Sequence, residues 1–317
     1  MSKMKLKHFL LIGTGFMLFG GILVAGTYTA GAQKTIVWEN GPKLLDMKEH
    51  TEKFKANEIK NLVIQAENQE INIRQGLDFE VTTQYEKSDE PKVVLKDQTL
   101  SIRAKGKQEY PMQISLEDTH PEITITVPKE ISLSDITIES SNNRLTMTDI
   151  TTKNLAVDSY SDSWLSFIGL KTDSVTVKDR FSSVDFSRLK AKKGNFTGEG
   201  SNFYFYDSAL TDSSTIVAKN GSVRLNDVDV PGYQLTLAGD STFQVNNETR
   251  EGSSFEKGNS KKGLTIEGKD TFIEWMDEKY QNSMSEQMDE MDDMDDMGDH
   301  MDQQMDHMDN HMEDETE

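Results

Sequence analysis

Apolar and polar side chains alternate through the middle of the chain, and this alternation recurs about every twenty residues between Ile136 and Val245. Alternation with a period of two is typical of a β-strand with one buried face. The first apolar positions of six successive units are spaced by 19 to 21 residues: Ile136, Leu155, Val175, Phe196, Ile216 and Leu235. A second apolar series keeps the same spacing: Leu145, Leu165, Val184, Phe203, Val223 and Phe243. Turn-forming residues separate the two series. The pattern predicts an all-β, β-solenoid-like stack of two-strand rungs.

The flanks of this array alternate less regularly. Strand patterns at residues 62–73 and 123–128 are separated by charged loops, and we expect this region to cover one end of the stack, because open sheet ends invite aggregation. Residues 264–272 echo residues 235–243 after a polar insertion, which predicts a final hairpin. The β-strand-repeat domain is therefore expected to span residues 58–275, with regular rungs at 136–245, after a stalk or linker at 33–57.

The N-terminus is apolar and predicts a membrane segment. Three lysines within residues 1–8 precede an apolar run at residues 9–32, which is long enough to span a bilayer core of about 30 Å. Because clustered lysines stay on the cytoplasmic side, we expect a single-pass signal-anchor helix with the repeat domain outside the cell. The small residues Ala30, Gly31 and Ala32 also fit a signal-peptidase site, so a cleaved signal is the alternative.

The C-terminal segment, residues 276–317, is acidic and rich in methionine and histidine. Residues 281–317 contain fifteen Asp or Glu and no Lys or Arg, which is most of the formal net charge of −21. Nine methionines follow one another at steps of three or four, a spacing that would place them on one stripe of a helix. Charge repulsion favours a disordered tail that becomes helical only under certain conditions.

Two binding functions are open for this tail. Thioether and imidazole groups suit Cu(I) and Ag(I), and the candidate metal ligands are Met301, His307, Met308, His311 and Met312. Alternatively, an adaptable methionine face flanked by carboxylates could capture a cationic amphipathic peptide. A solvating low-complexity tail is the simplest interpretation.

The repeat domain carries no catalytic pattern. The chain has no cysteine, which excludes disulfides, thiol catalysis and cysteine-bound zinc. His120 precedes a proline in a loop, and Asp158, Asp179 and Asp185 stand at differing offsets in the repeats, so we interpret them as solvated surface groups. We expect no enzyme activity, no catalytic residues and no cofactor. The acidic charge and the predicted location argue against a nucleic-acid partner.

Some aromatic residues stand beside the inward series rather than within it: Trp164, Phe181, Tyr204 and Tyr206. If they face outward, they could stack on sugar rings or contact apolar envelope components. The alternative is packing at the edges of the stack.

Two motifs resemble a known family. Residues 123–129 (ITITVPK) and 217–225 (VAKNGSVRL) are similar to the β-strand-repeat family labelled "putative adhesin" among domains of unknown function, over residues 59–274. The resemblance implies a β-solenoid-like fold and, for membrane-anchored LiaG-type members in Firmicutes, an association with cell-envelope stress. It implies no catalytic residues.

The sequence therefore predicts a non-enzymatic, membrane-anchored cell-envelope protein. Its repeat domain would be a scaffold or binding module linked to envelope stress or adhesion, with an envelope component, a cationic peptide or another protein as partner. Soft-metal binding or peptide capture by the tail is the alternative function. The oligomeric state is left open.

Overall fold

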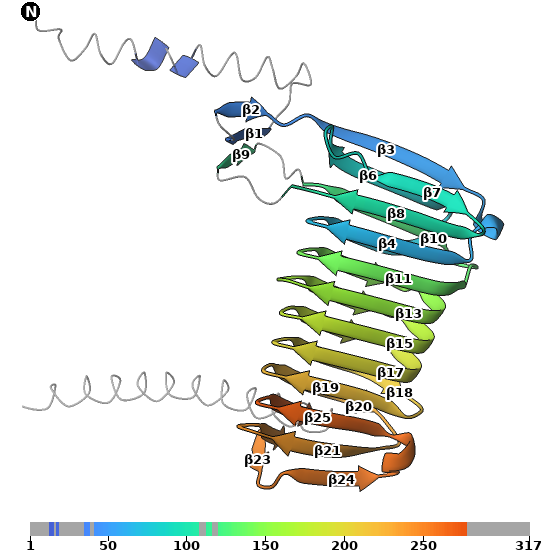
Figure 1. The fold of residues 1–317 in the computed structure, drawn as a ribbon, viewed down its shortest axis with the longest axis vertical. Coiled ribbons are helices and arrows are strands. Elements are labelled where there is room, and N and C mark those ends of the chain that lie inside the picture. The colour runs from blue at the N-terminus through green and yellow to red at the C-terminus, as the bar shows by residue number, and fades with distance from the viewer. Residues whose placement is uncertain are drawn as a thin grey trace, which may run out of the picture. The chain divides into compact units, whose positions relative to one another are not determined.

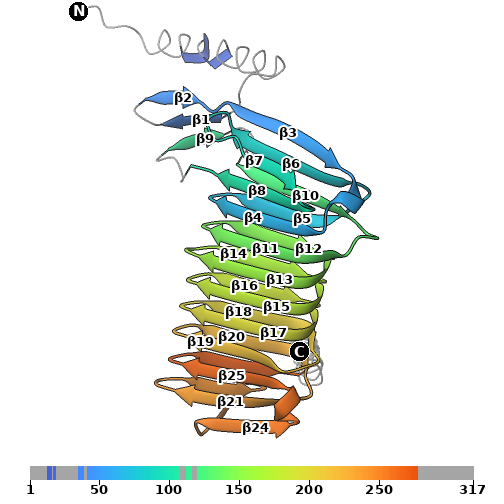
Figure 2. The same cartoon turned by 45° about the vertical axis from the view of Figure 1, so that its right-hand side comes forward.

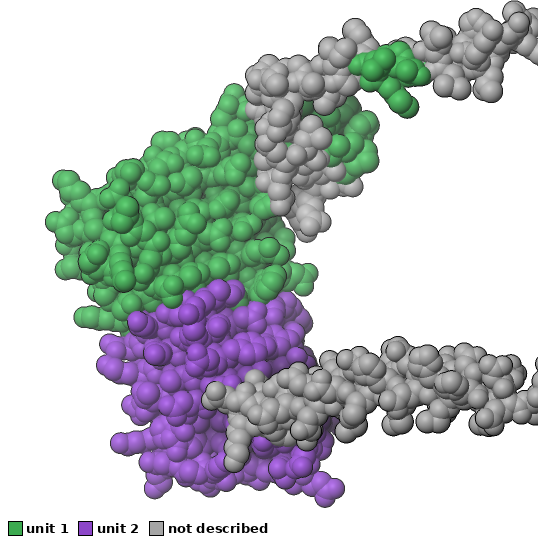
Figure 3. Space-filling view, turned by 180° about the vertical axis from the view of Figure 1, so that it is seen from behind, with its two compact units in different colours: residues 1–165 green, residues 166–317 purple. Residues whose placement is uncertain are grey.

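A computed structural model describes residues 13–15, 17–18, 35–38, 41–107, 112–115 and 120–277. The chain divides into two compact units, Met1–Leu165 and Ser166–Glu317 (Figure 3). Apart from helical residues near the N-terminus and two short 3-10 turns, Ala56–Glu58 and Ser260–Lys262, the ordered elements are strands. The all-β prediction is confirmed for the part that the structure describes.

Three predicted segments lie wholly or mostly outside the described residues. They are the cytoplasmic residues 1–8, the membrane segment 9–32 and the tail 276–317, of which only residues 276 and 277 are described. Within the described residues, no helix combines the length and apolar character that a membrane crossing requires.

The first unit consists of two larger sheets, in which most neighbouring strands are parallel, and a small third sheet. Its strands are β1 (Thr35–Trp38), β2 (Pro42–Leu44), β3 (Met47–Phe54), β4 (Asn61–Glu67), β5 (Glu70–Gly76), β6 (Phe79–Glu86), β7 (Lys92–Lys96), β8 (Thr99–Lys105), β9 (Gln113–Ser115), β10 (Glu122–Pro128), β11 (Leu133–Ser141), β12 (Arg144–Thr148), β13 (Thr151–Tyr160) and the start of β14 (Trp164–Ile168). One sheet has the order β7-β8-β4-β11-β13 and the other the order β3-β6-β10-β5-β12 (Figures 1 and 2).

Parallel register stacks the inward apolar residues of the first unit directly on one another. Leu62 of β4 pairs with Leu100 of β8 and with Ile136 of β11, and all three are at most 1 % exposed. On the second sheet, Ile71 of β5 pairs with Ile123 of β10 and Leu145 of β12. Each rung thus buries its apolar side chains against those of its neighbours, which is the main stabilising term for such a stack.

Spatial order departs from chain order in the first unit. The rung made by β4 and β5 lies between the β8/β10 pair and the β11/β12 pair, although β8 and β10 come later in the sequence. Three antiparallel strands complete this end: β6 pairs with β10, β3 with β6, and β7 with β8. The stretch predicted as a stalk, residues 33–57, instead contributes β1, β2 and β3. Every residue of β3 has a partner in β6, so this strand belongs to the sheet rather than to a linker.

The second unit continues the parallel pattern. Its strands after β14 are β15 (Lys171–Arg180), β16 (Ser183–Ser187), β17 (Lys190–Glu199), β18 (Asn202–Leu210), β19 (Ser214–Lys219), β20 (Ser222–Asp229), β21 (Gly232–Ala238), β22 (Thr242–Val245), β23 (Glu248–Arg250), β24 (Ser254–Gly258), β25 (Leu264–Lys269) and β26 (Phe272–Met276). Its two sheets have the orders β15-β17-β19-β25-β21-β24 and β16-β18-β20-β26-β22-β23.

The final-hairpin prediction for residues 264–272 is wrong. Ile266 of β25 pairs with Ile216 of β19 on one side and with Leu235 of β21 on the other, so this rung is inserted between two rungs that precede it in the sequence. The antiparallel strands β23 and β24 cover the outer edges of β22 and β21. After these strands, β25 and β26 take the position between the two earlier rungs. There Leu264, Ile266 and Ile273 are at most 1 % exposed.

A cluster of phenylalanine rings fills the centre of the second unit. Phe186 stacks on Phe167 with a centroid distance of 4.9 Å and on Phe205 with 5.1 Å, and Phe196 meets it edge-on at 5.2 Å. All four side chains are at most 1 % exposed. Parallel register places the same residue type at the same position in neighbouring rungs, as for Phe186 and Phe205. The rings of successive rungs therefore stack on one another.

Candidate functional site

The outward face of the second sheet in the second unit carries a row of charged and aromatic residues. Asp185, Tyr204, Arg224 and Glu274 are successive partners in the ladder of β16, β18, β20 and β26. Each follows an inward apolar residue by one position, so period-two alternation turns it outward. Together with Tyr206, these residues form what we call the tyrosine platform.

The two tyrosines of the platform have parallel rings. The ring centroids of Tyr204 and Tyr206 are 6.5 Å apart with an interplanar angle of 5°, and Tyr206 is 39 % exposed. The guanidinium carbon of Arg224 lies 5.6 Å from the centroid of the Tyr204 ring. Arg224 also forms an ion pair with Glu274, with Nε 3.3 Å from the carboxylate oxygen. The cation and the ion pair hold Tyr204 against the sheet.

Electrostatics keep the Tyr206 hydroxyl protonated. Burial of its ring raises the pKa of Tyr206 above the ordinary value, and the negative charge of Asp185 raises it further, while Arg224 acts in the opposite direction. The hydroxyl is therefore a hydrogen-bond donor at neutral pH. Beside it in the ladder, the side-chain oxygen of Asn226 is buried without a hydrogen-bond partner among the described residues.

The platform has the chemistry of a carbohydrate contact rather than of a reaction centre. It combines aromatic ring faces with hydroxyl, guanidinium and carboxylate groups, which can stack on a sugar ring and hydrogen-bond to its hydroxyls. Of the four aromatics that the sequence places beside the inward series, Trp164, Phe181 and Tyr206 are 49 %, 61 % and 39 % exposed, and Tyr204 is half-buried. Arg224 and Glu274 are absent from the sequence prediction. The twenty-residue repeat aligns Arg224 with Tyr204, but Glu274 joins them only through the inserted rung.

Two other exposed aromatics have local structural partners. Within the first unit, the guanidinium carbon of Arg144 lies 4.9 Å from the Trp164 ring centroid. Phe181 occupies a rung turn with φ of 65°, a left-handed conformation that is unusual for a bulky residue. Its ring covers Gly200, where an added Cβ would approach Phe181 Cδ1 to 2.5 Å. These contacts make both residues part of the turn structure.

A charged groove lies on the outward face of β8 and β4 in the first unit. Its volume is about 690 Å³, and its lining includes Glu67, Arg103 and Lys105. Lys105 Nζ lies 2.9 Å from Glu67, and the hydrogen bond to this carboxylate raises the pKa of Lys105. The groove is open to solvent, and acidic and basic side chains are mixed along its lining. It therefore does not favour a ligand of one particular charge.

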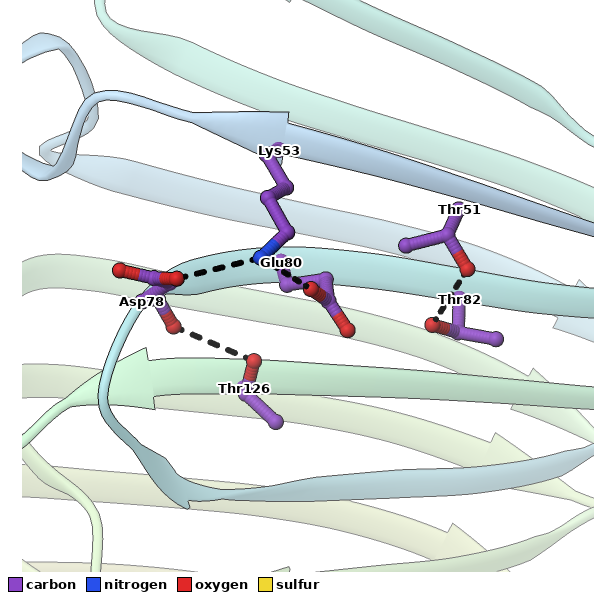
Figure 4. Close-up of polar contacts among 6 residues, drawn as sticks. All are labelled: Thr51, Lys53, Asp78, Glu80, Thr82 and Thr126. Carbon is purple, nitrogen blue, oxygen red and sulfur yellow. Dashed lines mark hydrogen bonds and ion pairs between the residues drawn. The ribbon is translucent and has the colours of Figure 1, made fainter.

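Ion pairs and hydrogen bonds between side chains cross the outward face of β3, β6 and β10 (Figure 4). Lys53 Nζ lies 3.2 Å from Asp78 and 3.3 Å from Glu80, and these contacts, that with Asp78 first, raise the pKa of Lys53. Thr126 donates a hydrogen bond to the Asp78 carbonyl, and the hydroxyls of Thr51 and Thr82 share another. Exposed ion pairs add little stability, but they cover the terminal strand with charge and so disfavour edge-to-edge association.

The predicted surface groups divide into exposed and buried ones. His120 is half-exposed with Nε2 3.0 Å from Glu70, and Asp158 is exposed. Asp179, in contrast, is only 2 % exposed, so its interpretation as a solvated group is wrong. It follows Val175 and Val177 at period two and therefore points inward. One of its oxygens accepts a hydrogen bond from the Ser182 amide, and the other has no partner among the described residues.

No metal site lies within the described ranges, where no cluster of three His, Asp or Glu side chains could hold an ion. The candidate ligands Met301, His307, Met308, His311 and Met312 lie outside those ranges.

Comparison with known proteins identifies the family but no function. The family model described as Toastrack DUF4097 matches residues 59–263, more than half of the chain. No curated protein matches the chain. Similar solved structures include a "putative cell adhesion protein" from Clostridium sporogenes, with 14 % identity, a TM-score of 0.35 and coverage of 74 % of this chain and 100 % of that chain. A "putative adhesin" from Bacteroides fragilis has 12 % identity, a TM-score of 0.39 and coverage of 73 % and 97 %. One from Parabacteroides distasonis has 12 % identity, a TM-score of 0.38 and coverage of 72 % and 97 %.

The family match confirms the resemblance to a β-strand-repeat family of unknown function that the sequence motifs carry. With identities of 14 % or less and TM-scores below 0.5, the three structures add no functional argument. The chain belongs to the Toastrack DUF4097 family.

Proposed function

We propose that this chain is a non-enzymatic, membrane-anchored module of the cell envelope that binds carbohydrate polymer through the tyrosine platform. The supporting observation is the row Asp185, Tyr204, Arg224 and Glu274, in which an aromatic ring and three hydrogen-bonding charged groups share one flat sheet face. A flat face suits an extended polymer better than a small molecule, which needs a concave site. The apolar run at residues 9–32 supports the membrane anchor.

Sedimentation with insoluble peptidoglycan tests the platform. The full chain, kept soluble with detergent, should co-sediment with the polymer, and the double variant Tyr204→Ala/Tyr206→Ala should lose most of this binding. If each ring contributes about 1.4 kcal/mol, a single replacement weakens binding about tenfold. Tyr160→Ala is the matched control, because Tyr160 is an exposed tyrosine on β13, outside the platform. Equal sedimentation of the double variant and the unchanged chain would refute the proposal.

A second candidate function, soft-metal binding, rests on the methionines of residues 281–317. Titration of the full chain with Cu(I) should give stoichiometric binding that is lost when Met301, Met308 and Met312 are all replaced by leucine. Replacing Met47 and Met147, which lie in the folded part, should leave binding unchanged. A helical gain in circular dichroism on adding a cationic amphipathic peptide, without Cu(I) binding, would instead favour peptide capture.

A further inference from the structure

One face of the small sheet in the first unit is apolar and exposed. Within β1, Thr35 and Val37 are buried at 2 %, whereas the alternate residues Ile36 and Trp38 are 40 % and 46 % exposed. Their neighbours on the adjoining strands complete this surface, which we call the apolar face: Ile36, Trp38, Leu44, Met112 and Ile114. Leu44, Met112 and Ile114 are 64 %, 48 % and 58 % exposed.

The residues of the apolar face are neighbours in the sheet rather than scattered. Ile36 pairs with Leu44 of β2 on one side and with Ile114 of β9 on the other. The amide of Trp38 donates a hydrogen bond to the carbonyl of Met112 at 2.9 Å. The strands β1, β2 and β9 lie together in Figure 1. A contiguous exposed apolar surface marks a place where the protein contacts another apolar phase.

The position of this sheet in the chain indicates that the apolar phase is a membrane. β1 begins at Thr35, and the apolar run ends at residue 32. Three Cα–Cα steps separate these positions, which limits the separation to about 11 Å even for an extended chain. The polar headgroup region adds only about 5 to 7 Å on each side of the hydrocarbon core. A sheet tied so closely to a membrane segment must therefore lie at the membrane surface.

We propose that the apolar face docks on the outer surface of the membrane, at the level where headgroups meet acyl chains. The proposal rests on the membrane anchor of the proposed function. Tryptophan favours this level because its ring is apolar and its indole N–H remains hydrogen-bonded. The contact orients the first unit against the bilayer and removes the apolar face from water. Other exposed apolar residues of the first unit, such as Leu77 and Val94, lie outside the small sheet and do not belong to the apolar face.

Depth-dependent fluorescence quenching tests this docking in the full chain. Trp164→Phe/Trp275→Phe leaves Trp38 as the only tryptophan, and Trp38→Phe/Trp275→Phe leaves Trp164, which is similarly exposed at 49 %. Both variants are reconstituted in vesicles of phosphatidylcholine and phosphatidylglycerol with brominated acyl chains. Trp38 should lose most of its emission and shift to the blue relative to detergent, whereas Trp164 should keep both its intensity and its wavelength.

Surface variants and a separate assay of the anchor complete the test. Ile36→Ser/Leu44→Ser should reduce the quenching of Trp38, and Val94→Ser should not. Resistance to carbonate extraction reports the anchor itself. If the chain resists extraction and Trp38 is no more quenched than Trp164, the docking is overturned while the anchor stands. If carbonate extracts the chain, the anchor fails, and quenching of Trp38 alone would still support a peripheral contact. Shielding of Trp38 from aqueous acrylamide without lipid quenching would indicate a second copy of the chain and overturn the proposal.

Discussion

Replacing Phe186 with alanine should destabilise the second unit by about 3 to 5 kcal/mol. Phe186 is fully buried and touches three other rings, Phe167, Phe205 and Phe196. Large-to-small replacement of a buried phenylalanine costs about 3 to 5 kcal/mol, because transfer energy is lost and a cavity remains. Since a domain is typically stable by about 5 to 15 kcal/mol, this one change should remove a large share of the total.

Phe186→Leu separates ring contacts from volume. Leucine keeps most of the apolar contact but removes the three ring pairs, each of which is worth about 0.5 to 1.5 kcal/mol. Together the three pairs amount to about 1.5 to 4.5 kcal/mol. Because contributions of side chains in contact are not additive, we expect a loss in the lower half of this range, smaller than that of the alanine variant. Phe181→Ala is the control: that ring is 61 % exposed and contacts the turn at Gly200, so its replacement should change stability by about 1 kcal/mol at most, well below the loss for Phe186→Ala.

Urea unfolding in a Trp38→Phe/Trp164→Phe background, followed by the fluorescence of Trp275 in β26, measures these differences. The slope of free energy against urea must stay constant across the variants, because stacked repeats can unfold in parts. A loss below about 1 kcal/mol for Phe186→Ala, or an equal loss for Phe181→Ala, would contradict the assignment of the ring cluster as the centre of the core.

Three further predictions concern other parts of the fold. Asn143→Ala should cost about 2 to 4 kcal/mol in urea unfolding, because the buried amide accepts from the Gln69 N–H at 2.6 Å and donates to the Ala66 carbonyl and the Ser140 hydroxyl; a loss like that of an exposed site would show that the network is not needed. Gly221→Ala should cost at least about 1 to 3 kcal/mol, since the added Cβ would lie 1.9 Å from the Ser201 carbonyl oxygen; an unchanged midpoint would mean that the backbone can yield. The pKa of Tyr206 is raised from about 10, so the stability it contributes is complete below pH 10 and is lost as pH rises through the folded pKa, because the unfolded state gives up its proton first. Tyr206→Phe should flatten this loss in unfolding measured above pH 10, and an identical pH profile would argue against it.

Much of the core follows from local periodicity. The inward series named by alternation includes Leu62, Ile136 and Val184, all at most 1 % exposed, because a strand sends alternate side chains to opposite faces. Asp179 shows the limit of judging by residue type. Its position at period two after Val177 indicates an inward side chain, but its charge favours a solvated interpretation, and the burial of 2 % follows the period.

Only part of the candidate site can be predicted from the sequence. Tyr204 and Tyr206 stand out because they flank the inward series, and Arg224 falls on the same row at the next repeat. Glu274 lies fifty residues beyond Arg224 and pairs with it only because β26 is inserted next to β20. The apolar face likewise depends on β9, which joins β1 from about 75 residues away.

The sequence by itself determined that the chain is built of strands, which residues point inward and where the turns between paired strands fall, because these properties depend on neighbours two or three positions apart. The order of the rungs was decided only by the tertiary structure. Residues 235–243 and 264–272 carry the same pattern and could each stack on the rung of Ile216. In the structure β25 and β26 have a rung on both sides, whereas β21 and β22 take the outer position, where β24 and β23 pair with their outer edges. This order depends on long-range pairings, and no local pattern records it.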